Sequence, residues 1–184
     1  MKIKHILTLL FALSIHQAFA QEKYFTRSGT LSFFSSTPME DIEAKNSQTS
    51  CILNTSTGEI AVSAQMKGFE FEKALMQEHF NENYMESDEF PNAIFKGKVV
   101  NAGDIDFSGD GSYDAAIEGE LTIHGVTKAV EEKGTFTISD GKIQGQSVFN
   151  VLLEDYKIKV PGAVKQQISE SIEITVDVML EEVK

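Results

Sequence analysis

Apolar and polar side chains alternate with a period of two along much of this chain. In residues 113–123 the odd positions are Tyr113, Ala115, Ile117, Gly119, Leu121 and Ile123. Near the C-terminus the same pattern places Ile172, Ile174, Val176, Val178 and Leu180 on one face. Since successive side chains of a strand point to opposite faces, both runs predict antiparallel strands with one dry and one wet face.

Shorter alternations begin at Leu31, Ile60, Ala93, Val130 and Ile143. Turn signals separate the runs at Thr57-Gly58, Asp110-Gly111, His124-Gly125 and Asp140-Gly141. Asp-Gly between alternating segments is a strong signal for a two-residue hairpin. The pattern therefore predicts an all-β fold of about seven or eight antiparallel strands arranged as a meander.

One segment has helical rather than strand spacing. In residues 71–80 we expect Phe71, Ala74, Leu75 and Glu78 to share a helix face, with good helix formers between them. The length allows two or three turns. We predict one short helix that acts as a lid over one end of the barrel.

The inward faces of the predicted strands are apolar and contain no Lys or Arg. An eight-stranded barrel can be filled by its own side chains or can hold one small ligand, and the sequence leaves both alternatives open. An occupant of such an interior would be an uncharged, apolar molecule. The predicted ligand-binding residues are the large apolar side chains on these inward faces, namely Phe95, Ile117, Leu121, Phe136, Phe149 and Ile174.

The first twenty residues have the pattern of a secretory signal. Lys2 and Lys4 precede an apolar run at 6–15, and Ala18-Phe19-Ala20 is a small-residue cleavage site. The run is too short to span a bilayer, which takes about 20 residues. We expect cleavage after Ala20, no lipid anchor because Gln21 is not a cysteine, and one domain over residues 21–184 in the periplasm or outside the cell.

Charge and cysteine content narrow the partners. The formal net charge is −12, and loss of the two signal lysines would make it −14. Such a surface repels nucleic acid and anionic headgroups, so no nucleic-acid partner is expected. No second long apolar stretch follows residue 15, so no integral membrane span is expected either. Cys51 is the single cysteine. An intramolecular disulfide is therefore impossible, and we expect Cys51 to be a small, buried hydrophobic residue.

Candidate catalytic and metal motifs are incomplete. Asp104, Asp106 and Ser108 begin a calcium-loop pattern, but its twelfth position is Ala115, which lacks the closing carboxylate. His79 has no second histidine nearby to complete a zinc site. Ser147 lies in a strand pattern without the second glycine of a nucleophile elbow. We therefore predict no enzyme, no cofactor and no metal.

Three blocks of the chain carry a resemblance to the YceI-like family. In the first, a short helix precedes Phe90-Pro91-Asn92-Ala93-Ile94-Phe95. The second is Gly119-Glu120-Leu121-Thr122-Ile123-His124-Gly125-Val126-Thr127-Lys128, and the third is Asp155-Tyr156-Lys157-Ile158. Their order is similar to that of the family across nearly all of residues 21–184.

The resemblance implies an eight-stranded antiparallel, lipocalin-like β-barrel, although the chain has no Trp and so lacks the signature of true lipocalins. It implies an exported protein that holds a polyisoprenoid, a fatty-acid derivative or a similar lipid, without catalytic residues. The alternative is a filled barrel that acts as an interaction or stress-response protein. A homodimer is also left open.

Overall fold

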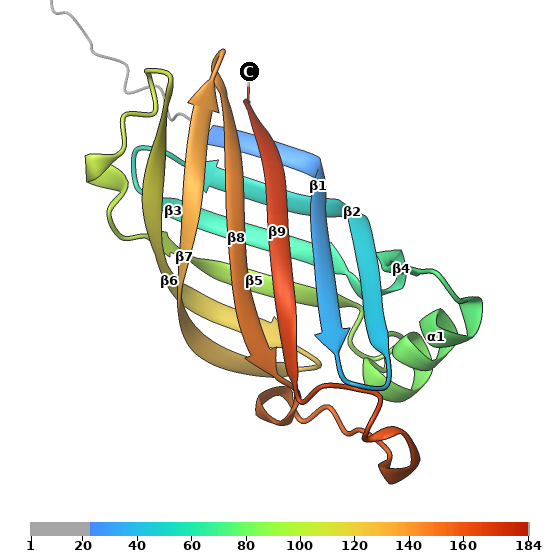
Figure 1. Ribbon diagram of the computed structural model, residues 1–184. Coiled ribbons are helices and arrows are strands. Elements are labelled where there is room, and N and C mark those ends of the chain that lie inside the picture. Colours follow the sequence, from blue (N-terminus) through green and yellow to red (C-terminus); the bar gives the residue numbers. More distant parts are fainter. Residues whose placement is uncertain (1–22, 184) are drawn as a thin grey trace, which may run out of the picture.

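The computed structural model describes residues 23–183, which form long antiparallel strands and a few short helical turns (Figure 1). The strands are β1 Lys23–Ser36, β2 Asp41–Asn54, β3 Glu59–Gln65, β4 Glu70–Phe71, β5 Asn92–Val99, β6 Gly111–Ile123, β7 Val126–Ser139, β8 Lys142–Leu152 and β9 Ser171–Glu182. The helical elements are η1 Met66–Gly68, α1 Ala74–His79, η2 Phe80–Tyr84, η3 Ala102–Asp104, η4 Leu153–Tyr156 and η5 Gly162–Val164.

Eight of these strands close into a barrel. The order is β1-β9-β8-β7-β6-β5-β3-β2, and β2 pairs back onto β1. The two-residue β4 adds to β2 at Ala44 and Lys45 without entering the ring. The predicted eight-stranded antiparallel barrel with one short α-helix is confirmed.

The two clearest alternating runs became β6 and β9, with the predicted faces inward. Leu121 and Val178 are buried, while their neighbours Glu120 and Met179 are exposed. The hairpins at both ends of β7 turn through residues with positive φ: 50° and 70° at His124-Gly125, and 51° and 73° at Asp140-Gly141. Positive φ at both central residues is the geometry that matches the twist of the flanking strands.

The sequence pattern missed β2, because a bulge and two buried polar residues interrupt its alternation. The inward side chains are at even positions up to Asn46 and at odd positions from Thr49 onward. Asn46 is fully buried, and its side chain makes hydrogen bonds to backbone groups around the bulge. Its Nδ2 donates to the backbone oxygen of Gln65 (2.8 Å), and its Oδ1 accepts from the Gln48 amide (2.7 Å). The change of parity keeps Cys51 inside the barrel.

One end of the barrel is filled by side chains. Leu53, Val99, Ile143 and Leu180 each have 0% of their surface exposed. They pack in one cluster with Ile138, which pairs with Ile143 beside the hairpin between β7 and β8. This hairpin lies at the end of the barrel away from the helical segment (Figure 1). Such packing leaves no room for a ligand at that end. Any interior space must therefore lie in the middle or at the opposite end.

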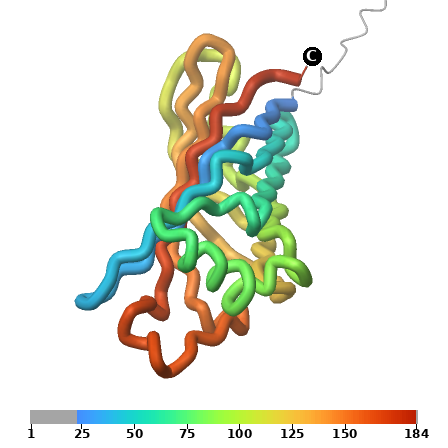
Figure 2. The backbone as a smooth tube through the Cα atoms, turned by 90° about the vertical axis from the view of Figure 1, so that its right-hand side faces the viewer, coloured from blue at the N-terminus to red at the C-terminus, as the bar shows by residue number. Residues whose placement is uncertain are grey.

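The opposite end is covered by non-strand segments. Figure 2 shows the helical segment (green) and the loop after β8 (orange to red) gathered there. The predicted helix is shorter than expected, because Phe71 belongs to β4 and the chain after His79 widens into the π-turn η2. The predicted apolar face was wrong: Leu75 is 60% exposed, and Met76, His79 and Phe80 face the interior instead.

Candidate ligand-binding cavity

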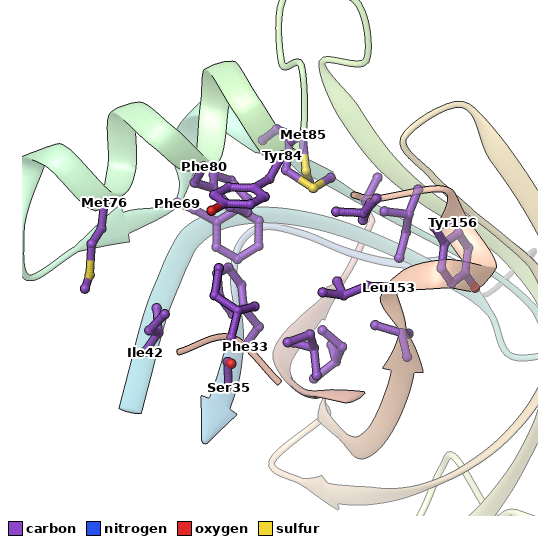
Figure 3. A pocket seen from close by; sticks show the side chains of 18 of the residues that line it. Phe33, Ser35, Ile42, Phe69, Met76, Phe80, Tyr84, Met85, Leu153 and Tyr156 are labelled. Carbon is purple, nitrogen blue, oxygen red and sulfur yellow. The ribbon is translucent and has the colours of Figure 1, made fainter. Parts of the chain in front are cut away.

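A cavity of about 260 Å³ lies at the helical end of the barrel. Its walls come from β1, β2, β5, β6, β8 and β9. Its cover comes from the segment around α1 and η2 and from the loop after β8 (Figure 3). Met76 and Tyr84 enter from the helical side, and Leu153 and Tyr156 enter from η4. The cavity is thus lined by segments that are far apart in the sequence.

Four phenylalanines form a cluster against this cavity. Phe33 stacks on Phe80 with ring centroids 5.4 Å apart and planes 25° apart. Phe69 and Phe71 each contact both of these rings, at centroid distances of 5.1 to 5.7 Å. Aromatic pairs at these distances add to the free energy of packing beyond area alone. The cluster therefore fixes the helical cover against β1.

A second cavity of about 110 Å³ lies deeper in the barrel. Four residues line both cavities: Leu31, Ala93, Leu121 and Phe149. The two cavities are therefore neighbours along the barrel axis, with Phe149 and Leu121 between them. Together they reach the range of small-molecule sites, which begins at about 300 Å³.

All six residues predicted from the sequence lie on these walls. Phe95, Ile117 and Phe136 line the smaller cavity, and Ile174 lines the larger one. Leu121 and Phe149 line both. Whether these side chains contact a ligand stays a prediction.

The sequence reasoning missed most of the larger cavity. Its further apolar lining comes from β1, the segment 66–85 and the loop after β8; it includes Phe33, Met66, Phe69, Phe80, Met85, Ile158 and Ile168. Phe33 belonged to a recognised alternation, so its parity could have placed it here. The others lie outside regular strands and follow no period that predicts a face.

No lysine or arginine lines either cavity, but a few other polar groups do. Glu40 is paired with Lys73 at 3.2 Å, and Ser35 Oγ accepts from the Ser169 amide at 2.9 Å. Burial raises the pKa of Tyr84 and of Tyr156 above the usual value of a phenol, so both side chains are uncharged near pH 7. The larger cavity thus presents an almost uncharged surface.

The smaller cavity has one acidic residue that the sequence analysis overlooked. Glu132 lies on β7 opposite Ile117, and both side chains point inward. Burial raises the pKa of its carboxyl. A charged carboxylate needs water or a cation beside it to be stable. The sequence could have revealed this residue, because Glu132 falls at a position of the alternating pattern that faces the interior.

The incomplete motifs have local structural roles. Ser147 Oγ donates to the Lys133 backbone oxygen (2.7 Å) at the end of the β7–β8 ladder. Asp106 accepts from the amide and the hydroxyl of Ser108 in the exposed loop before β6. Within residues 23–183 no group of three or more His, Cys, Asp or Glu side chains is placed to hold a metal ion. Likewise, no helix in that range is long and apolar enough to cross a membrane.

The fold is a closed antiparallel β-barrel with a largely apolar interior. The chain belongs to the YceI-like domain family, whose match covers residues 15–180. No curated protein sequence matches it.

Solved structures share the fold at low sequence identity. A polyisoprenoid-binding domain from Saccharophagus degradans, implicated in plant cell wall breakdown, has a TM-score of 0.76 at 12% identity, over 89% of this chain and 99% of that one. BcnA from Burkholderia cenocepacia has a TM-score of 0.68 at 12% identity, over 83% and 95%. A YceI protein from Campylobacter jejuni has a TM-score of 0.53 at 14% identity, over 100% and 91%.

Proposed function

We propose that this protein is a carrier that holds one apolar, chain-like molecule inside its barrel. The observation that supports it most is the pair of adjoining cavities, whose lining is apolar except for a few side chains. A space of this kind excludes charged molecules and favours hydrocarbon, since each buried methylene contributes about 0.8 kcal/mol. Two adjoining cavities suit an extended molecule.

The relatives agree with this proposal. One structural neighbour is described as a polyisoprenoid-binding domain, and its fold covers nearly the same length as this chain. A polyisoprenoid, a fatty-acid derivative or a similar lipid would fit the chemistry of the walls. The proposal includes no catalytic step.

The experiment is a binding titration on delipidated protein with the neutral fluorophore N-phenyl-1-naphthylamine. Emission should rise and shift to shorter wavelength as the probe enters the cavity. Ile174→Lys places a charge on the inner wall between Phe33 and Phe149, and Glu173→Lys places the same charge on the exposed outer face. An unpaired buried charge costs several kcal/mol, so the first variant should weaken binding at least about tenfold.

The outer variant should bind within about twofold of the wild type, because its charge remains in water. Circular dichroism shows whether both variants fold. If wild-type protein fails to bind the probe, the interior is effectively filled and the carrier function is wrong. Equal binding by two folded variants would contradict the inward placement of the ligand.

Export and assembly are also proposals. We infer that residues 1–20, which lie outside the described range, are a secretory signal removed after Ala20, and that the protein works in the periplasm or outside the cell. The intact mass of the exported protein should match a chain beginning at Gln21, and a Met1 form there would contradict it. Homodimer formation stays a prediction that the molar mass in solution tests.

A further inference from the structure

The wall of the barrel is incomplete between β7 and β8. Their ladder runs from Ser139 paired with Lys142 to Gly134 paired with Ser147, and it ends there. Residues 126–133 continue on β6, and residues 148–152 continue on β9, but these two stretches do not pair with each other. The strands therefore diverge toward the helical end.

Glu132 and Phe149 lie beside this divergence, one on each strand, and both line the smaller cavity. Glu132 is half-buried, so its carboxyl lies between the apolar interior and solvent. Within residues 23–183 its carboxylate makes no hydrogen bond and no ion pair. By contrast, the Glu40 carboxylate at the larger cavity is already paired with Lys73.

We propose that Glu132 contacts the polar head of the bound chain and selects a head that is an uncharged hydrogen-bond donor, such as an alcohol or a primary amide, over a carboxylate or phosphate. This inference rests on the proposed carrier function. A carboxylate can only accept hydrogen bonds, so a donor group placed next to it is bound favourably. An anionic head would meet like charge in a setting of reduced dielectric, with no Lys or Arg on either cavity wall to offset it.

The rise in the pKa of Glu132 agrees with this placement, because burial is its cause. Partial burial disfavours the charged form of an acid that has no partner. A hydrogen-bond donor on the ligand would offset this effect. Val130 and Phe136, which line the smaller cavity from the same strand, would hold the apolar chain.

The test compares two chains of equal length at pH 8, where palmitate carries its charge and hexadecanol does not. Each competes with N-phenyl-1-naphthylamine for delipidated protein. Hexadecanol should displace the probe from the wild type at a concentration at least about tenfold lower than palmitate, which corresponds to about 1.4 kcal/mol. Glu132→Gln keeps the shape and removes the charge, so the preference should fall below about threefold.

Glu131→Gln is the matched control, because Glu131 is the exposed neighbour on the outer face of the same strand. It removes the same charge and should leave the preference unchanged. Glu132→Lys should reverse the preference. Equal displacement by the two chains in the wild type, or an unchanged ratio in Glu132→Gln, would overturn the head-group inference while the carrier function stands. Absence of probe binding would overturn both.

Discussion

The ring of Phe95 lies over Gly119 on the inner face of the barrel. A Cβ atom added at Gly119 would come within 2.7 Å of Phe95 Cζ, and one added at Gly97, the cross-strand partner of Gly119, would come within 2.5 Å of the same atom. The ring therefore occupies the space of two missing side chains. This contact lets β5 and β6 approach closely while a large aromatic side chain lines the smaller cavity.

Gly119→Ala should destabilise the protein by about 1–3 kcal/mol, because the added methyl must displace the Phe95 ring or the adjacent backbone of β5. Urea denaturation measures the change. Gly103→Ala is the control, since a Cβ there meets nothing within 4 Å. Equal stability of the two variants would contradict the close packing of Phe95 on Gly119.

Phe149→Ala should change which apolar molecules the protein retains. The side chain lines both cavities, so its loss would merge them into one larger space. The free energy of unfolding should fall by about 3–5 kcal/mol at most. Lipid profiles of the purified variant and wild type measure the effect, with exposed Glu118→Gln as the unaffected control. A similar response to both substitutions would count against the inward placement of Phe149.

His124 ties three segments together at the helical end. Its Nε2 lies 2.8 Å from Glu86 Oε2, and its Nδ1 donates to the Tyr156 backbone oxygen at 3.1 Å. The ring also meets Phe90 edge-on at a centroid distance of 4.7 Å. The hairpin between β6 and β7 thereby holds both η4 and the turn after η2.

His124→Ala should lower the free energy of unfolding by about 1–3 kcal/mol, since a buried backbone acceptor loses its donor. The variant should also bind the probe more weakly, because two segments of the cavity cover lose their anchor. Lys128→Ala removes the nearby exposed pair with Asp155 and should cost about 1 kcal/mol or less. Thermal unfolding of both variants measures the difference, and a larger loss from Lys128→Ala would refute the anchoring role.

Cys51 should resist alkylation in the folded protein. Burial raises the pKa of its thiol from 9.0 to about 12, and the thiolate is the reactive form. Iodoacetamide at pH 8 should label the unfolded chain at least about a hundredfold faster than the native one. Comparable rates would show that the core around β2 opens readily.

The raised pKa of the Cys51 thiol makes the free energy of unfolding depend on pH in the alkaline range. The folded state holds the Cys51 proton more tightly than the unfolded state, so this contribution is complete below about pH 9 and is lost as the pH rises toward 12. Tyr84 and Tyr156, whose pKa values burial also raises, add to the loss. Cys51→Ala should therefore decline less steeply than the wild type in unfolding experiments between pH 8 and 11, and an identical slope would contradict this.

The sequence predicted the barrel because most of its strands follow a simple rule. In β6 and β9 every inward position is apolar or small, and one parity holds from end to end. The rule fails in β2, where the bulge near Asn46 reverses the parity and a buried amide replaces an apolar side chain. A buried polar side chain whose hydrogen bonds are made to the backbone cannot be recognised from the pattern of apolar residues.

The site was predicted only where strands form it. Phe95 and Phe149 follow from parity, but Phe80 and Met85 depend on how the chain widens into η2, which tertiary contacts decide. Glu132 was missed for the opposite reason, because a lone acid on a dry face looks like a break in the pattern. That break is where the head of the ligand is proposed to lie.

The measurement that tests the central claim most directly is organic extraction of the purified, natively folded protein followed by mass spectrometry. The account predicts about one equivalent of an apolar, chain-like molecule with an uncharged polar end, which dissociates from the barrel when it unfolds. Protein that is fully folded and free of any such molecule, and that takes up none when mixed with a lipid extract of the cells producing it, would contradict the carrier function.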